Sequence, residues 1–348
     1  MAKRPFVVDF HAHILEPHVL KASAGRTVVT GFGAIAEPPR APGSRRDIWF
    51  KQMMDPEAHL EGLAKMGVDV SVISSSNVIQ NTAWADAGTG LELDRRCNDM
   101  IADWVRRYPD RFVGTFTMPL KDPHLSLQEM ERAVKQLGLR IANLPANVES
   151  VYLGEPRFRP FWEAVNELGV IAFIHPDGVL DPWFQKYSLW NSVGQPIEEA
   201  KVMSSLIYEG VLESFPDLKI VMAHGGGYMP HYHGRLDRNV KNRPDTMANI
   251  SHEPSWYLKR FYYDTCIYDP VTLDALIERV GPDHILMGSD FPVGEVLLRG
   301  SANRRVAVGI EMLNHLRFAD RLRHLALRRA TTGCGRASRS YSESSDPD

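Results

Sequence analysis

The stretch FVVDFHAH, residues 6–13, opens with an almost wholly apolar run and ends in two histidines spaced two positions apart. Seven further short runs rich in Val, Ile and aromatic residues follow it along the chain. They cover residues 68–74, 112–118, 137–144, 170–176, 219–225, 261–266 and 284–290. Such runs, most of them ending in Gly, Pro, Ser or Asp, are typical of strands buried on both faces.

Amphipathic segments separate these runs. In PEAHLEGLAKMG, residues 56–67, Leu60, Leu63 and Ala64 share one helical face, and Gly67 is suited to end the helix. Residues 93–109 repeat this pattern. Eight strands that alternate with helices predict an α/β fold, a (β/α)8 TIM barrel, which we expect to form a single domain over residues 1–330.

Two regions depart from the alternation. The segment of residues 14–55 is long and rich in Gly and Pro, and it follows the carboxyl end of the first predicted strand. Because barrel enzymes carry their active-site loops at this end, we expect residues 14–55 to be an active-site loop insertion. Residues 331–348 have almost no apolar content, which predicts a disordered polar tail.

Composition excludes several classes of function. The chain has 348 residues, with 40 Lys and Arg against 43 Asp and Glu, so its charge gives no reason to expect nucleic acid or an anionic membrane as partner. Its three cysteines form no CxxC pair, which argues against a disulfide framework. No leader-like or membrane-length apolar run is seen. We therefore expect a cytoplasmic protein.

A group of histidines and one aspartate indicates a metal site. His11 and His13 lie two positions apart on a strand, so their side chains point the same way. His175, His224 and Asp290 each fall at the end of a predicted strand, the rim where barrel enzymes place catalytic groups. Imidazole and carboxylate ligands suit Zn²⁺ first and Mn²⁺ second. The alternative to metal binding is that the two histidines of this HxH pair are structural residues packed within the strand.

Other catalytic motifs are missing from the sequence. The HGGG run that begins at His224 also occurs in esterase oxyanion loops, but no GxSxG nucleophile motif accompanies it. Neither a Walker A motif nor HExxH is found, and GTG near Gly88 lacks the third glycine of a dinucleotide site. We therefore expect no organic cofactor.

The motifs DFHAH, FIHP, AHGGG and GSDFP, in this order, resemble the amidohydrolase superfamily. More narrowly, they are similar to the branch of aminocarboxymuconate-semialdehyde decarboxylase and related aromatic-acid decarboxylases, from about Val7 to about Gly294. The resemblance implies metal-dependent, non-oxidative decarboxylation of a small aromatic or conjugated carboxylic acid in a catabolic pathway. It also implies a homodimer or a dimer of dimers.

The resemblance assigns roles to individual residues. His11, His13, His175 and Asp290 match the metal ligands, and Asp290 is also expected to relay a proton. His224 matches a histidine that does not bind the metal but activates its bound water or moves a proton.

Four more residues are expected to bind substrate. Arg235 matches an arginine that holds the substrate carboxylate, and Arg243 resembles one inserted into the neighbouring subunit's site. Trp190 matches an aromatic residue near the substrate, and Arg46 is offset from the family's loop arginine. A solvated helix face is the alternative for Arg235 and Arg243, and a core position is the alternative for Trp190. Because Arg46 is offset, the sequence defines the identity of the substrate less closely than it defines the metal ligands.

Two other functions remain open from the sequence. The same site acting on a carbonyl or a double bond would make the protein a hydrolase or a hydratase of a ring or ring-cleavage product. A non-catalytic metal-binding barrel is the second alternative, and a metal site closed to exchangeable water would support it.

Overall fold

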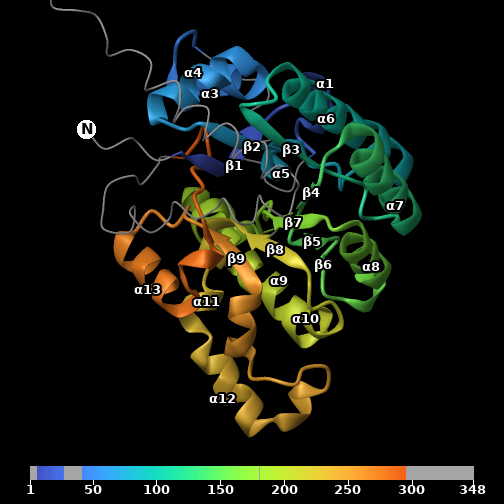
Figure 1. The fold of residues 1–348 in the computed structure, drawn as a ribbon, viewed down its shortest axis with the longest axis vertical. Coiled ribbons are helices and arrows are strands. Elements are labelled where there is room, and N and C mark those ends of the chain that lie inside the picture. The colour runs from blue at the N-terminus through green and yellow to red at the C-terminus, as the bar shows by residue number, and fades with distance from the viewer. Residues whose placement is uncertain (1–5, 27–40, 180, 295–348) are drawn as a thin grey trace, which may run out of the picture. The chain divides into compact units, whose positions relative to one another are not determined.

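Eight parallel strands form one curved sheet in the computed structural model (Figure 1). The structure describes residues 6–26, 41–179 and 181–294. The strands, in sheet order, are β1 (Val8–Ile14), β2 (Val70–Ser75), β3 (Phe112–Phe116), β4 (Ile141–Leu144), β7 (Ile171–Ile174), β8 (Lys219–Met222), β9 (Phe261–Asp264) and β10 (Ile285–Leu286). Each overlaps one of the eight predicted runs, so the eight predicted strands are confirmed.

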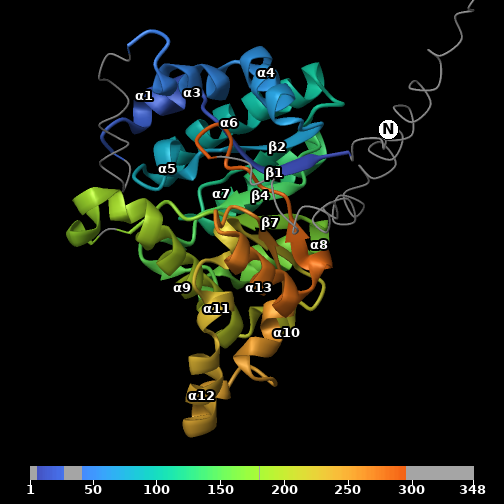
Figure 2. The same ribbon diagram turned by 90° about the vertical axis from the view of Figure 1, so that its left-hand side faces the viewer.

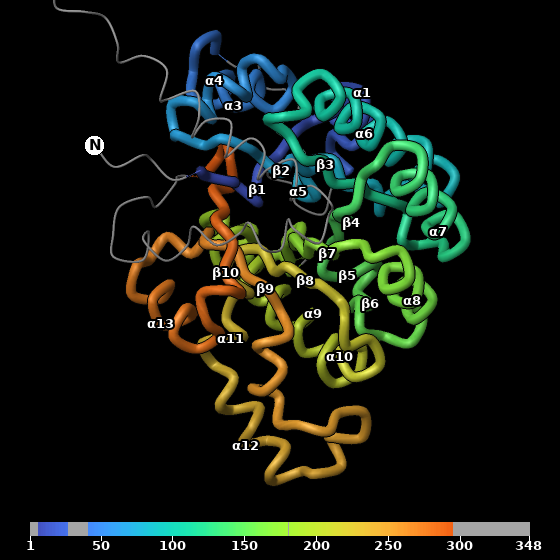
Figure 3. Tube along the Cα trace, in the orientation of Figure 1, coloured from blue at the N-terminus to red at the C-terminus, as the bar shows by residue number. Residues whose placement is uncertain are grey.

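Backbone hydrogen bonds close the sheet into a barrel. The Phe10 amide donates to the Met287 carbonyl at 2.8 Å, and the His13 amide donates to the Phe291 carbonyl at 2.8 Å. These bonds join β1 to the chain around and after β10, while β10 also pairs with β9 (Figure 3). The predicted (β/α)8 barrel is therefore confirmed.

Helices pack their apolar faces against the outside of the barrel, where they share one core with the strands. They are α4 (Pro56–Met66), α6 (Ala87–Arg107), α7 (Pro123–Arg132), α8 (Arg159–Leu168), α9 (Gln195–Tyr208), α10 (Val211–Ser214) and α13 (Pro270–Val280). Three of them begin at an Asp-Pro pair, at Asp55, Asp122 and Asp269, whose carboxylates each accept a backbone N–H of the first turn. The aspartate satisfies a free donor and the proline fits the first helical position, so these sequences start helices.

Short elements sit in the connections at the carboxyl ends of the strands. They are α5 (Asn77–Gln80), α11 (Met229–Tyr232), α12 (Gly234–Asn242) and the hairpin of β5 (Asn147–Val148) with β6 (Val151–Tyr152). Helix α12 extends away from the barrel strands in both ribbon views (Figures 1 and 2). No helix among the described residues has the length and apolar character that crossing a membrane requires.

The connection after β1 differs from the predicted loop insertion at residues 14–55. Its described part contains α1 (Pro17–Ser23) and α3 (Arg45–Met54). Glu16 caps α1 by accepting the Val19 amide, and Ser44 caps α3 by accepting the Asp47 amide. The glycines and prolines that suggested a loop are concentrated between Gly31 and Gly43, which leaves the flanking sequences free to form helices. Residues 27–40 and the predicted tail at 331–348 lie outside the described residues.

Candidate metal centre and active site

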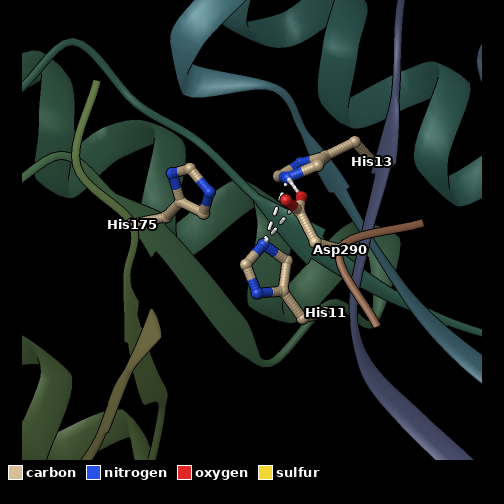
Figure 4. A group of neighbouring side chains, drawn as sticks. All are labelled: His11, His13, His175 and Asp290. Atoms are coloured by element: carbon tan, nitrogen blue, oxygen red, sulfur yellow. Dashed lines mark hydrogen bonds and ion pairs between the residues drawn. The ribbon is translucent and has the colours of Figure 1, made fainter. Parts of the chain in front are cut away.

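Four side chains predicted as ligands converge at the carboxyl-end mouth of the barrel (Figure 4). β1 carries His11 and His13, while His175 follows β7 and Asp290 follows β10. Their ligand atoms all lie within 4.8 Å of one another. Nε2 of His13 is 3.1 Å from Nε2 of His11 and 2.9 Å from Oδ1 of Asp290. The structure thus gathers groups that are distant in sequence into one candidate metal-binding group.

The partners of the outer ring nitrogens fix which atoms face the centre of this group. Nδ1 of His11 lies 2.6 Å from Oδ2 of the buried Asp264, and Nδ1 of His175 lies 2.9 Å from the Pro176 carbonyl. Since both partners accept hydrogen bonds, each Nδ1 carries the proton and each Nε2 keeps its lone pair. The lone pair of His11 Nε2 thus faces Nε2 of His13 and Oδ1 of Asp290, and such a convergence of imidazole nitrogens and a carboxylate oxygen fits a divalent metal ion.

Burial favours the neutral form of His13 and His175. Burial lowers the pKa of His13, and burial together with the surrounding imidazoles lowers the pKa of His175 well below its usual value. Burial alone would raise the pKa of Asp290, but the His13 hydrogen bond and the nearby imidazoles hold it below its usual range. Neutral imidazoles and an ionised carboxylate are the forms that bind metal.

His224 lies beside the four-residue group but has a different partner. It follows β8, and its ring centroid is 5.0 Å from that of His175. Nδ1 of His224 is 2.5 Å from Oε1 of Glu199, a fully buried residue of α9. Burial by itself would lower the pKa of His224, yet the Glu199 carboxylate outweighs burial and raises it. The Glu199 contact therefore favours a protonated His224 ring beside the four-residue group.

Gly227 allows this pairing. Its φ is 59°, and a Cβ there would lie 2.3 Å from the Pro196 carbonyl oxygen and 2.7 Å from Oε2 of Glu199. Any side chain would therefore push the loop away from α9 and break the contact between Glu199 and His224. The glycine run after His224 thus brings the backbone close to α9.

Strained backbone marks the same region. His224, Tyr268 and Asp290 have φ values of 49°, 62° and 57°. For residues other than glycine this conformation costs on the order of 1–3 kcal/mol each and persists where the surrounding structure enforces it, often at active sites. The Tyr268 hydroxyl donates to Oδ2 of Asp290 at 3.4 Å, which leaves Oδ1 toward His13. Tyr268 thus steadies the only carboxylate of the four-residue group.

These groups open into a cavity of about 820 Å³. His13, His175, His224 and Asp290 line it together with aromatic rings. The rings belong to Trp49, Trp190, Tyr228 and Tyr268. A cavity with apolar rings and a few convergent polar groups is the usual form of a small-molecule site.

The predicted substrate residues fall at different places. Trp190 is 4% exposed and lines the cavity. Arg46 is half-buried on α3, but its neighbour Arg45 is the one that lines the cavity, with its guanidinium 4.9 Å from the Trp49 ring centre.

The two arginines of the α12 region lie outside the cavity that the described residues of this chain form. Arg235 is exposed at the start of α12. Arg243 is exposed just after α12 and donates to the Asn239 side chain at 2.6 Å. Their roles in binding substrate remain predictions.

Sequence reasoning did not single out several residues of this site. Asp264 ends a predicted strand just as the predicted ligands do, so its position carried a usable signal. Glu199 lies on the sequence PIEEAK in α9 and resembles any charged helical residue. Tyr268 and Arg45 lie in connections between strands, where no sequence pattern distinguishes a residue that lines the cavity from one on the outer surface.

Known proteins resemble this chain over most of its length. Residues 8–296 match the family model described as amidohydrolase. The chain is 33% identical over 247 residues to 2-amino-3-carboxymuconate-6-semialdehyde decarboxylase of Dictyostelium discoideum, covering 70% of this chain and 68% of that protein.

Solved structures share the fold. The 5-carboxyvanillate decarboxylase of Sphingomonas paucimobilis matches with a TM-score of 0.79 at 23% identity, over 90% of this chain and 99% of that one. A dihydroxybenzoic acid decarboxylase of Polaromonas sp. JS666, crystallised with manganese and the inhibitor 2-nitroresorcinol, matches with a TM-score of 0.74 at 22% identity, over 90% and 98% of the two chains. The chain therefore belongs to the amidohydrolase family, in the branch of aminocarboxymuconate-semialdehyde decarboxylase and related decarboxylases.

Proposed function

We propose that this protein is a metal-dependent decarboxylase, a carbon–carbon lyase that removes CO₂ without oxidation from a small aromatic or conjugated carboxylic acid. One observation carries the proposal: a buried carboxylate–imidazole pair, Glu199 with His224, lies beside a three-histidine, one-aspartate group at the wall of a ring-lined cavity. The decarboxylases among the relatives support this reaction over the hydrolase or hydratase alternative.

His11, His13, His175 and Asp290 would hold one divalent cation. When bound, the cation supplies a Lewis acid that fixes a carboxylate and an adjacent oxygen. We propose Zn²⁺ as the native metal, because it suits a mixed imidazole and carboxylate site. Mn²⁺ is the second candidate, because the Polaromonas relative was crystallised with bound manganese.

Loss of CO₂ leaves the electron pair of the broken bond on a substrate carbon, which must take up a proton. His224 is the group placed to deliver it, because Glu199 favours the protonated form of its ring. Asp290, held through Oδ2 by Tyr268, is proposed to relay the proton as well as to bind the metal.

The substrate ring would lie against Trp190 and Trp49 in the cavity. We place Arg45 and Arg46 at the α3 side, where Arg45 reaches the cavity and can pair with a carboxylate. In the proposed homodimer or dimer of dimers, Arg235 and Arg243 would serve a site that includes the partner subunit. A cytoplasmic location is part of the same proposal.

Measuring CO₂ release tests the function. The protein, loaded with Zn²⁺ or Mn²⁺, is incubated with a panel of hydroxylated and amino-substituted aromatic acids. We expect CO₂ from at least one acid, and we expect the His224→Ala variant to keep its metal while turnover falls steeply. Amide cleavage or hydration without CO₂ would favour the alternative function, and full turnover by His224→Ala would remove His224 from the mechanism.

A further inference from the structure

His231 lines the cavity but has no role in the proposed decarboxylation. It lies on α11, is half-buried and lines the cavity wall. Its ring makes no hydrogen bond to any described residue, and only its backbone amide is bonded, to the Tyr228 carbonyl. An imidazole that faces a cavity without a protein partner has its hydrogen-bonding capacity available to a ligand.

A fixed positive charge lies behind this ring. Nη1 of Arg279 donates to Nε2 of His233 at 2.9 Å, and Nδ1 of His233 donates to the Pro230 carbonyl at 3.1 Å. His233 thereby holds the Arg279 guanidinium against α11. Burial, and then Arg279 and His233, lower the pKa of His231, so its ring is a neutral donor in a region of positive potential. Such a region favours a negatively charged ligand group.

The cavity offers a separate cationic group on another element. Arg45 is the one Arg or Lys that lines the cavity within the described ranges 6–26, 41–179 and 181–294. It lies on α3, and the ribbon views place α3 and α11 apart, with barrel strands between them (Figures 1 and 2). The cavity of about 820 Å³ falls in the upper part of the roughly 300–1,000 Å³ range of small-molecule sites. A single-ring acid held at the metal group can therefore carry a further substituent toward α11.

We propose that His231 is a specificity residue that donates a hydrogen bond to a second acidic substituent of the substrate, so that the preferred substrates are aromatic dicarboxylic acids. The reacting carboxylate lies at the metal group, and the second carboxylate lies at His231. This inference rests on the proposed function for the position of the first carboxylate. Hydrogen bonds to charged groups are the stronger ones, so loss of this donor should have a measurable effect.

Binding of simple probes tests the proposal independently of turnover. Benzoate, isophthalate and terephthalate are titrated calorimetrically into the manganese-loaded protein. We expect at least one dicarboxylate to bind about tenfold more tightly than benzoate. In His231→Phe this preference should disappear while benzoate affinity is unchanged, and His231→Gln, which keeps a donor, should retain part of it. The exposed His124 of α7 gives the control His124→Phe, which should bind like the unmodified protein.

Three results would overturn the assignment of His231. They are equal affinity of the unmodified protein for all three acids, an undiminished dicarboxylate preference in His231→Phe, and a loss of benzoate affinity in both His231 variants. The CO₂ assay reports on the proposed function separately. A protein that prefers dicarboxylates through His231 yet releases no CO₂ from any acid would lose its proposed reaction but keep this binding role.

Discussion

The histidines of this site are distinguished by what their Nδ1 atoms contact. His11 and His175 donate through Nδ1 to Asp264 and to a backbone carbonyl, which directs Nε2 at the metal group. His224 instead shares its Nδ1 proton with the carboxylate of Glu199. These contacts separate the proposed metal ligands from the proposed proton donor within one cluster of rings.

Glu199→Gln tests the proton-donor assignment. A neutral amide no longer stabilises the protonated His224 ring, so we expect kcat to fall by about 10²–10⁴-fold while KM and metal content change little. Steady-state CO₂ release and metal analysis measure these quantities. Glu198→Gln is the matched control, because Glu198 is the preceding residue of α9 and bonds to Asn147, Tyr152 and Lys201 away from His224. An unchanged kcat in Glu199→Gln would exclude the role given to this pair.

Asp264→Asn tests the orientation of His11. The amide holds the ring less firmly and makes Nε2 less basic, so metal affinity should weaken by about 10–100-fold. Competition with a chromogenic chelator measures it, with the exposed Asp274→Asn on α13 as control. Equal metal affinity of Asp264→Asn and the unmodified protein would show that His11 needs no such support.

Residue-level prediction succeeded where the position along a strand carried the information. The histidine and aspartate positions at strand ends could be predicted because parallel strands in a barrel deliver their carboxyl ends to one rim. Glu199 could not, since its partner lies 25 positions away and only the packing of α9 against the β8 loop brings them together. Arg45 could not be predicted either. Which of Arg45 and Arg46 faces the cavity depends on the orientation of α3, which the sequence does not give.

At the scale of elements, all eight strands were predicted, although their bounds differ from those of the predicted runs, and the shifts at β1 and β10 have identifiable causes. β1 continues to Ile14 because Ala12, His13 and Ile14 pair with β2. β10 contains only Ile285 and Leu286, because the chain then turns and Asp290 adopts a positive φ to reach the metal group. Strand pairing causes the shift at β1, and the turn that brings Asp290 to the metal group causes the shift at β10. A run of apolar residues reveals neither cause.

Helix α6 contains a buried carboxyl with consequences for stability. Asp94 is 1% exposed and accepts the Thr82 hydroxyl through Oδ1, while Oδ2 has no hydrogen-bond partner among the described residues. Burial raises the pKa of Asp94 from 3.8 to about 8. The folded protein therefore binds a proton that the unfolded chain releases above about pH 4.

This linkage predicts that stability falls as pH rises. Because the folded pKa is above the unfolded one, the contribution of Asp94 is complete below pH 3.8 and is lost progressively up to about pH 8. Between pH 5 and 7 the loss approaches about 1.4 kcal/mol per pH unit. Asp94→Asn, which keeps the acceptor for Thr82, should remove this part of the slope when the free energy of unfolding is measured with urea. The exposed Glu92→Gln on α6 should keep it, and parallel slopes for Asp94→Asn and the unmodified protein would contradict the prediction.

At the scale of the whole molecule, barrel closure creates the site. β1, β7 and β10 are far apart in sequence, yet closing the sheet between its first and last strands brings His11, His13, His175 and Asp290 within 4.8 Å. Alternation of strands and helices was enough to predict this architecture. The helices at the two ends of the connection after β1 were not predicted, because the glycines and prolines in its middle obscured them.

Metal binding is therefore expected to stabilise the barrel as a unit. A cation that binds only the folded chain raises the free energy of unfolding by about 2.7 kcal/mol when its free concentration is one hundred times Kd. His11, His13, His175 and Asp290 are the side chains proposed to hold that cation.

Calorimetric titration of Zn²⁺ or Mn²⁺ into chelator-stripped protein tests this claim most directly. We expect one tight site per chain in the unmodified protein and loss of that site in His175→Ala and in Asp290→Ala, with His224→Ala still binding. Equal binding by His175→Ala and the unmodified protein, or no tight site in the unmodified protein, would contradict it.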